Sequence, residues 1–69
     1  MNAQLRTTLL REPRPAEAND VRLAMEPPGW RLAWQLEGGR RQEPLGPIFM
    51  RVSDAHQAAV ELRMAHGLT

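Results

Sequence analysis

The feature that most constrains this chain is an alternation of apolar and other residues in three successive short runs. The runs are VRLAM (21–25), WRLAWQLE (30–37) and IFMRV (48–52), and in each of them every second residue is large and apolar. Because successive side chains of a strand point to opposite faces of a sheet, this period of two predicts three half-buried strands. At 69 residues, the chain is long enough for one small domain with a single core.

The segment EPPG (26–29) determines how the first two strands pair. Its prolines are turn residues and have no place in a central strand. If these four residues form the turn, three rungs follow on one face: Met25–Trp30, Leu23–Leu32 and Val21–Trp34. Both tryptophans are then expected in the core and not on a contact surface.

The third strand can pair with the second in two registers. In the preferred register GGRRQEPLGP (38–47) is a long loop, and the three rungs are extended by Val52, Met50 and Ile48, in that order. In the alternative, a tight turn at the two glycines places Leu45 opposite Leu32 and requires a bulge near Gly46-Pro47. The choice matters because a shift by one residue exchanges the two faces of a strand.

The segment SDAHQAAVELRMAHGLT (53–69) has the spacing of a helix with one apolar side. Ser53 or Asp54 is expected to cap it, with Asp54 and Gln57 as a capping box, and Gly67 is expected to end it. A stripe of mostly small side chains would let it lie close on the sheet: Ala55, Ala58, Ala59 and Leu62. The predicted fold is α+β, a three-stranded antiparallel sheet packed on one C-terminal helix (βββα) over residues 20–69.

Residues 1–19 are predicted to be an N-terminal arm and a proline-rich linker. REPRPAEAND (11–20) contains two prolines and no large apolar residue, which is typical of a linker. The preceding segment has Leu5 and Leu9 at helical spacing but is too short to form a helix by itself. We therefore expect the arm to be flexible or to become ordered only against a partner.

No residue pattern indicates catalysis. Ser53, Asp54 and His56 lie within one turn of the expected helix, where they cannot form the geometry of a hydrolase triad. His56 and His66 do not have the i, i+4 spacing of a helical metal pair, and the chain contains no Cys that could supply a thiolate. We expect no catalytic residue, no metal and no cofactor, and interpret the chain as non-enzymatic.

The expected outer face of the sheet is the first candidate for a binding site. In the preferred register it carries Arg22, Ala33 and Phe49 on one rung and Ala24, Arg31 and Arg51 on the next, with Arg40 and Arg41 in the neighbouring loop. Arg and aromatic residues are enriched at interaction hot spots, so the five arginines and Phe49 are the predicted partner-binding residues. The alternative is a solvated face that nearby glutamates neutralise, since the net charge is only +1.

The expected helix offers a second candidate surface. Val60, Met64 and Leu68 follow one another at a spacing of four residues, partly outside the alanine stripe. Exposed apolar patches on small domains often mark association. These residues are predicted to mediate homodimerisation or to receive Leu5 and Leu9 of the arm, and the alternative is that they extend the core.

From Gly29 onward, the order GWRLAW…GG…GPIFMRVSDAHQAA resembles small modules of three strands and a following helix, such as the arm-type DNA-binding domain of tyrosine integrases. The resemblance implies a sheet face laid into the DNA major groove, with Arg22, Arg31 and Arg51 on that face and Arg40 and Arg41 near phosphates. In size and composition the chain is also similar to short accessory proteins of phages and mobile elements, which often bind and block a host protein.

The expected function is that of a small non-enzymatic protein-binding regulator or inhibitor acting on a host or cellular protein. The alternative is a DNA- or RNA-binding regulator that uses the arginine-bearing sheet face. Because the sequence has no Cys, no signal-peptide pattern and no apolar run long enough to span a membrane, we expect a cytoplasmic protein without membrane contact.

Overall fold

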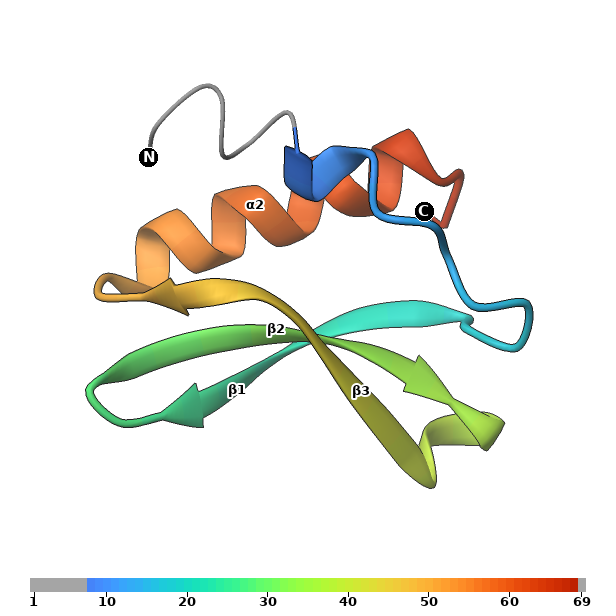
Figure 1. Cartoon of the computed structure of the whole chain (residues 1–69), viewed down its shortest axis with the longest axis horizontal. Coiled ribbons are helices and arrows are strands. Elements are labelled where there is room, and N and C mark those ends of the chain that lie inside the picture. The colour runs from blue at the N-terminus through green and yellow to red at the C-terminus, as the bar shows by residue number, and fades with distance from the viewer. Residues whose placement is uncertain (1–7, 69) are drawn as a thin grey trace.

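Three antiparallel strands and a C-terminal helix form the framework of the molecule (Figure 1). A computed structural model describes residues 8–68. The elements are β1 (Asp20–Glu26), β2 (Gly29–Leu36), the short 3-10 helix η1 (Glu37–Gly39), β3 (Arg41–Phe49) and α2 (Val52–Ala65). The sheet order is β1-β2-β3, and α2 lies on one side of it. The predicted βββα fold is confirmed.

The hairpin of β1 and β2 has the expected register. Glu26 pairs with Gly29 across the turn, and the three predicted rungs form, including Val21 opposite Trp34. The Pro27–Pro28 peptide bond in this turn is cis. Gly29 has no room for a side chain, because a Cβ there would collide with the carbonyl oxygen of Phe49 on β3.

The preferred register of the third strand is wrong, and the alternative is confirmed. Leu36 pairs with Arg41 across a tight turn, so Leu45 lies opposite Leu32. The register shifts between Leu32 and Trp30, which pairs with Phe49. The prolines of QEPLGP (42–47) are compatible with a strand because β3 lies at the edge of the sheet, where ladder hydrogen bonds can be missing.

This register moves several residues away from their expected positions. Phe49 is only 6% exposed and belongs to the core, so it cannot be part of an outer binding face. Met50 and Val52, expected in the core, are 67% and 50% exposed. Arg51 is the N-cap residue of α2 and does not stand beside Arg31 in the sheet. The expected Arg31–Arg51 pair is therefore wrong.

The helix packs on the sheet through the predicted stripe. Ala55, Ala58, Ala59 and Leu62 are buried, while Trp34 is 3% exposed and Trp30 is partly buried against the same core. The expected side-chain cap is absent, because α2 begins at Val52 and its N-cap residue makes no side-chain hydrogen bond. The predicted end at Gly67 is confirmed: Gly67 has a φ of 65°, and the Leu68 N–H donates to the Arg63 carbonyl oxygen at 2.8 Å.

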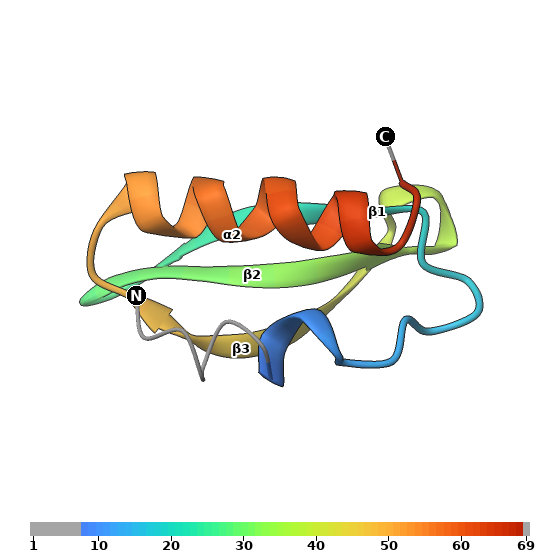
Figure 2. The same ribbon diagram turned by 90° about the horizontal axis from the view of Figure 1, so that it is seen from above.

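An N-terminal helical turn completes the layer above the sheet. Residues 8–10 lie on the same side of the sheet as α2 (Figure 1). Figure 2 shows α2 along β1 and β2, and the turn beside β3. Leu9 is 2% exposed and lies so close to Gly46 that a Cβ there would be 2.8 Å from Leu9 Cδ1. Leu9 therefore contributes to the core of its own chain, whereas Leu5 lies outside the described residues.

An ion pair fastens the end of α2 to the start of β1. Arg63 Nε donates to Asp20 Oδ1 at 2.9 Å, and its Nη2 donates to the Val21 carbonyl oxygen. Partial burial raises the pKa of Asp20, but the Val21 N–H and the Arg63 guanidinium outweigh this, so that its pKa lies below the ordinary value of 3.8. The ionised carboxylate thus stabilises the contact between helix and sheet.

Replacing Leu9 tests whether the N-terminal turn is part of the core. Leu9→Ala should lower the free energy of unfolding by about 2–4 kcal/mol, because it leaves a cavity in place of the buried Leu9 side chain. Met64→Ala, at a helix position that is 66% exposed, should change it by about 0.5 kcal/mol or less. Urea denaturation followed by tryptophan fluorescence measures both, and equal effects would contradict the packing of Leu9.

Acid titration tests the Asp20–Arg63 pair. The pKa of Asp20 in the folded state lies below 3.8, its ordinary value. The stabilisation of the fold by the Asp20–Arg63 pair is therefore complete above pH 3.8 and is lost as the pH falls through the lower, folded-state pKa. Asp20→Asn should remove this pH dependence and cost about 1 kcal/mol at neutral pH, a figure reduced for solvent screening because the carboxylate is partly exposed. Arg63→Met removes the partner of Asp20 and should lower the stability in the same way. Arg40→Met serves as the control, because Arg40 has no ion pair in the described range. Parallel stability curves for wild type and Asp20→Asn would contradict the role of the pair.

Candidate functional site

The sheet face opposite α2, here called the outer face, is left uncovered by the described residues (Figure 1). It carries alternate residues of each strand, and the β1–β2 register places Arg22 opposite Ala33 and Ala24 opposite Arg31, as expected. On β3 the opposing residues are different: Pro44 faces Ala33, in the position expected for Phe49. The outer face therefore has two short side chains and a proline at its centre.

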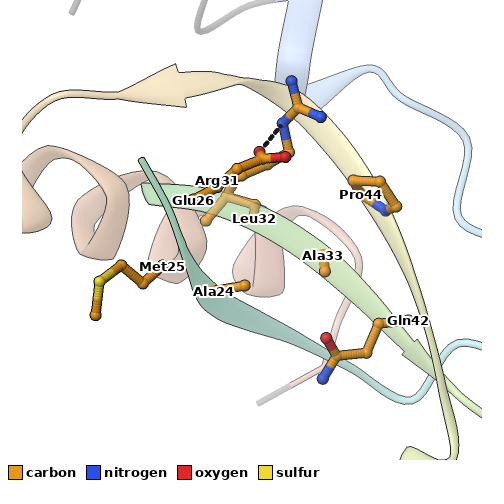
Figure 3. A pocket seen from close by; sticks show the side chains of 8 residues that line it. All are labelled: Ala24, Met25, Glu26, Arg31, Leu32, Ala33, Gln42 and Pro44. Carbon is orange, nitrogen blue, oxygen red and sulfur yellow. Dashed lines mark ion pairs between the residues drawn. The ribbon is translucent and has the colours of Figure 1, made fainter. Parts of the chain in front are cut away.

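A shallow hollow of about 230 Å³ lies over this centre (Figure 3). Ala24 and Ala33 form the floor of the hollow, because their side chains are too short to fill the space between the longer side chains around them. Figure 3 shows the Glu26–Arg31 pair on one side of these alanines and Gln42 on the other. The residues that line the hollow come from all three strands: Ala24, Met25, Glu26, Arg31, Leu32, Ala33, Gln42 and Pro44.

The polar rim of the hollow is an ion pair between β1 and β2. Arg31 Nε and Glu26 Oε2 are 3.0 Å apart, and the two side chains are 33% and 46% exposed. The two facing atoms themselves are almost completely covered, although the rest of each side chain reaches solvent. The charge of Arg31 is therefore compensated within the chain, and the rim presents both signs of charge.

Two other arginines of the predicted site also have partners within the chain. Arg22 Nε donates to Gln35 Oε1 at 2.7 Å and lies 4.0 Å from Asp20 Oδ2. Arg41 lies within 4.0 Å of three carboxylates, those of Glu17, Glu37 and Glu43. Nearby glutamates, the alternative raised by the sequence, thus pair with Arg31 and Arg41, whereas the partners of Arg22 are Gln35 and Asp20.

The remaining predicted residues do not join the outer-face site. Arg40 and Arg51 have no ion pair with any residue in the range 8–68, and they flank opposite ends of β3. Phe49 is buried on the other face of the sheet. The structure brings together Arg22 and Arg31 of the predicted set. Gln42 and Pro44 were not predicted as residues of the outer face, and only the tight-turn register of the third strand places them there.

The helix surface predicted for association is partly used by the core. Leu68 packs against the core cluster, and Val60 is partly buried, whereas Met64 is 66% exposed. Beside them, the His66 ring meets Trp34 edge to face, with ring centroids 5.3 Å apart. Met64 is thus the member of this predicted surface that stays open to a partner.

Comparison of the chain with protein-family models, with curated proteins and with solved structures finds no match in any of the three. Among residues 8–68, no group of three or more His, Cys, Asp or Glu side chains is placed to hold a metal ion. No helix in the same range is long and apolar enough to cross a membrane.

A double-mutant cycle tests the ion pair at the rim of the hollow. Glu26→Ala and Arg31→Ala should couple by about 0.5–1 kcal/mol in unfolding free energy, the range of partly exposed pairs. A cycle of Arg31→Ala with Arg51→Ala should show no coupling beyond about 0.3 kcal/mol, because these residues do not meet in the sheet. The reverse order of the two coupling energies would contradict the register of β3.

Proposed function

We propose that this chain is a non-catalytic protein-binding module, a small cytoplasmic regulator or inhibitor that binds a cellular or host protein through the outer face. The observation that supports this most directly is the hollow, with an apolar floor and an ion pair at its rim. Concave sites with apolar floors and a few oriented polar groups are the usual form of binding pockets. An apolar side chain of the partner would fill the hollow, and Arg31 and Glu26 would orient it.

The distribution of charge favours a protein partner over nucleic acid. Affinity for a phosphate backbone depends on several basic side chains that are free to neutralise phosphates. On the outer face, Arg22 and Arg31 are already engaged by Gln35 and Glu26. Of the arginines predicted for the site, the two without an ion pair in the described range, Arg40 and Arg51, stand at opposite ends of β3 and not on one patch.

Nucleic-acid binding is the second proposal, and one observation favours it. Arg22 and Arg31 lie on the same uncovered sheet face, which is the arrangement that the resemblance to arm-type DNA-binding domains implies. In this case their present partners, Gln35 and Glu26, would have to give way to phosphates or base edges. Such binding would be strongly dependent on salt, because each neutralised phosphate releases counterions.

Filling the hollow with a charge tests the protein-binding proposal. Pro44→Lys should lower the affinity for a purified partner by about tenfold or more, since central contacts dominate interface energies. Gln57→Lys adds the same charge on the exposed side of α2 and should leave the affinity within about twofold. The partner is first isolated from host extract, and calorimetry with the purified pair measures stoichiometry and affinity. Equal binding by both variants would show that the outer face is not the site.

Titration of the wild-type chain and of Arg31→Gln with random duplex DNA decides between the two proposals. The protein-binding proposal leads us to expect no measurable binding at low salt. Binding that weakens steeply with salt and is lost in Arg31→Gln would instead support the nucleic-acid proposal and overturn the first.

A further inference from the structure

The two edges of the sheet differ in how far they can accept another strand. On β3, Pro44 and Pro47 lack N–H groups, and Gly46 has a φ of 75° at the irregular stretch of the strand. Such features are the common means of blocking an edge. β1 consists of seven residues without proline or glycine. The edge that remains suited to strand pairing is therefore that of β1.

Side chains already occupy one residue of the β1 edge. The Val21 N–H donates to Asp20 Oδ1 at 2.7 Å, and the Val21 carbonyl oxygen accepts from Arg63 Nη2. Because these groups have side-chain partners, Val21 is one of the residues whose backbone points away from β2. In an antiparallel ladder every second residue does so, which places Leu23 and Met25 in the same set. Their outward N–H and carbonyl groups are left for a partner strand.

We propose that two copies of the chain pair through their β1 edges, antiparallel and centred on Ala24, so that the two three-stranded sheets become one. In this register Leu23 of one copy exchanges both backbone hydrogen bonds with Met25 of the second copy, and Met25 with Leu23. These four bonds use the free groups and leave Val21 with its own side-chain partners. A register centred on Leu23 would instead require the occupied groups of Val21. The inference is independent of what the outer face binds.

The side chains along β1 fit this register. Arg22 of each copy lies opposite Glu26 of the second copy, so the pairing places opposite charges side by side, next to the contacts that these two side chains already make with Gln35 and Arg31. Both side chains have room for this, since Arg22 is 58% and Glu26 is 46% exposed. At the centre Ala24 meets Ala24 without steric conflict. Met25, which is 71% exposed in the single chain, is placed against Leu23 of the second copy.

The position of α2 is consistent with the same pairing. Figure 2 shows α2 running along β1, and Arg63 reaches from the helix to the β1 backbone. Val60 lies three residues before Arg63 and thus on the same flank of the helix. In the pair of chains, this flank meets its counterpart, and the partly buried Val60 becomes covered. The two hollows then lie on one continuous outer face.

Cysteine cross-linking tests the pairing and its register, because the chain contains no cysteine. Residues 24 and 24 of the two copies would form a non-hydrogen-bonded pair with Cα atoms about 4.5 Å apart, which suits a disulfide. Ala24→Cys should therefore cross-link rapidly under mild oxidation. Arg22→Cys or Glu26→Cys alone should not, since four residues of offset separate identical positions by about 13 Å. A mixture of these two variants should cross-link.

Proline substitution tests the contribution of the backbone. Met25→Pro removes the N–H that faces Leu23 of the second copy, and the dimer affinity in sedimentation equilibrium should fall by about tenfold or more. Met25→Thr keeps the N–H and should stay within about threefold. Circular dichroism confirms that each variant is folded. Equal weakening by both variants would assign the contact to the side chain and overturn the proposed backbone pairing.

Two further outcomes would overturn the inference. One is a protein that remains monomeric at about 100 μM, together with no Ala24→Cys cross-link. The other is self-cross-linking of Arg22→Cys as fast as that of Ala24→Cys, which requires a different register. Because these measurements involve no other partner, they are unaffected by the failure of the proposed function.

Discussion

Most of the molecule depends on the tight turn between β2 and β3. Glu37, Gly38 and Gly39 all have positive φ, a backbone conformation that favours glycine, and they reverse the chain at once, so that Leu36 pairs with Arg41. This short connection brings residues 41–47 into the sheet. It places Leu45 in the core, turns Phe49 inward after the irregular stretch, and lets α2 begin at Val52.

The sequence predicts the part of the fold that a fixed spacing controls. The four residues from Glu26 to Gly29 allow one register for β1 and β2, and the alanine stripe identifies the buried side of α2. The third strand was mispredicted because Pro44, Gly46 and Pro47 are typical of a loop, and period two does not show which strand will be an edge. Leu9 was not assigned to the core, since nothing near it in sequence indicates that it covers β3 beside α2.

The candidate site, like the fold, was predicted from the sequence only in the part that local patterns control. Arg22 and Arg31 were placed on the outer face correctly because they belong to the well-defined hairpin. The sequence left open whether nearby glutamates neutralise this face, and for Arg31 the distance of 3.0 Å between its Nε and Glu26 Oε2 shows such a pair. The hollow depends on Pro44 standing opposite Ala33, and therefore on the register that was not preferred. Local patterns thus located the face, whereas its shape and charge balance required the pairing of distant segments.

The Asp20–Arg63 pair links the stability of the fold to the edge of its sheet. The same guanidinium that fastens α2 also occupies the carbonyl oxygen of Val21, and the same carboxylate accepts the Val21 N–H. A long partner strand would have to displace both, and so to loosen the helix. A strand that needs only Leu23 and Met25 avoids this cost. The fold therefore blocks its β1 edge against extended pairing and leaves open the short segment that is self-complementary in charge.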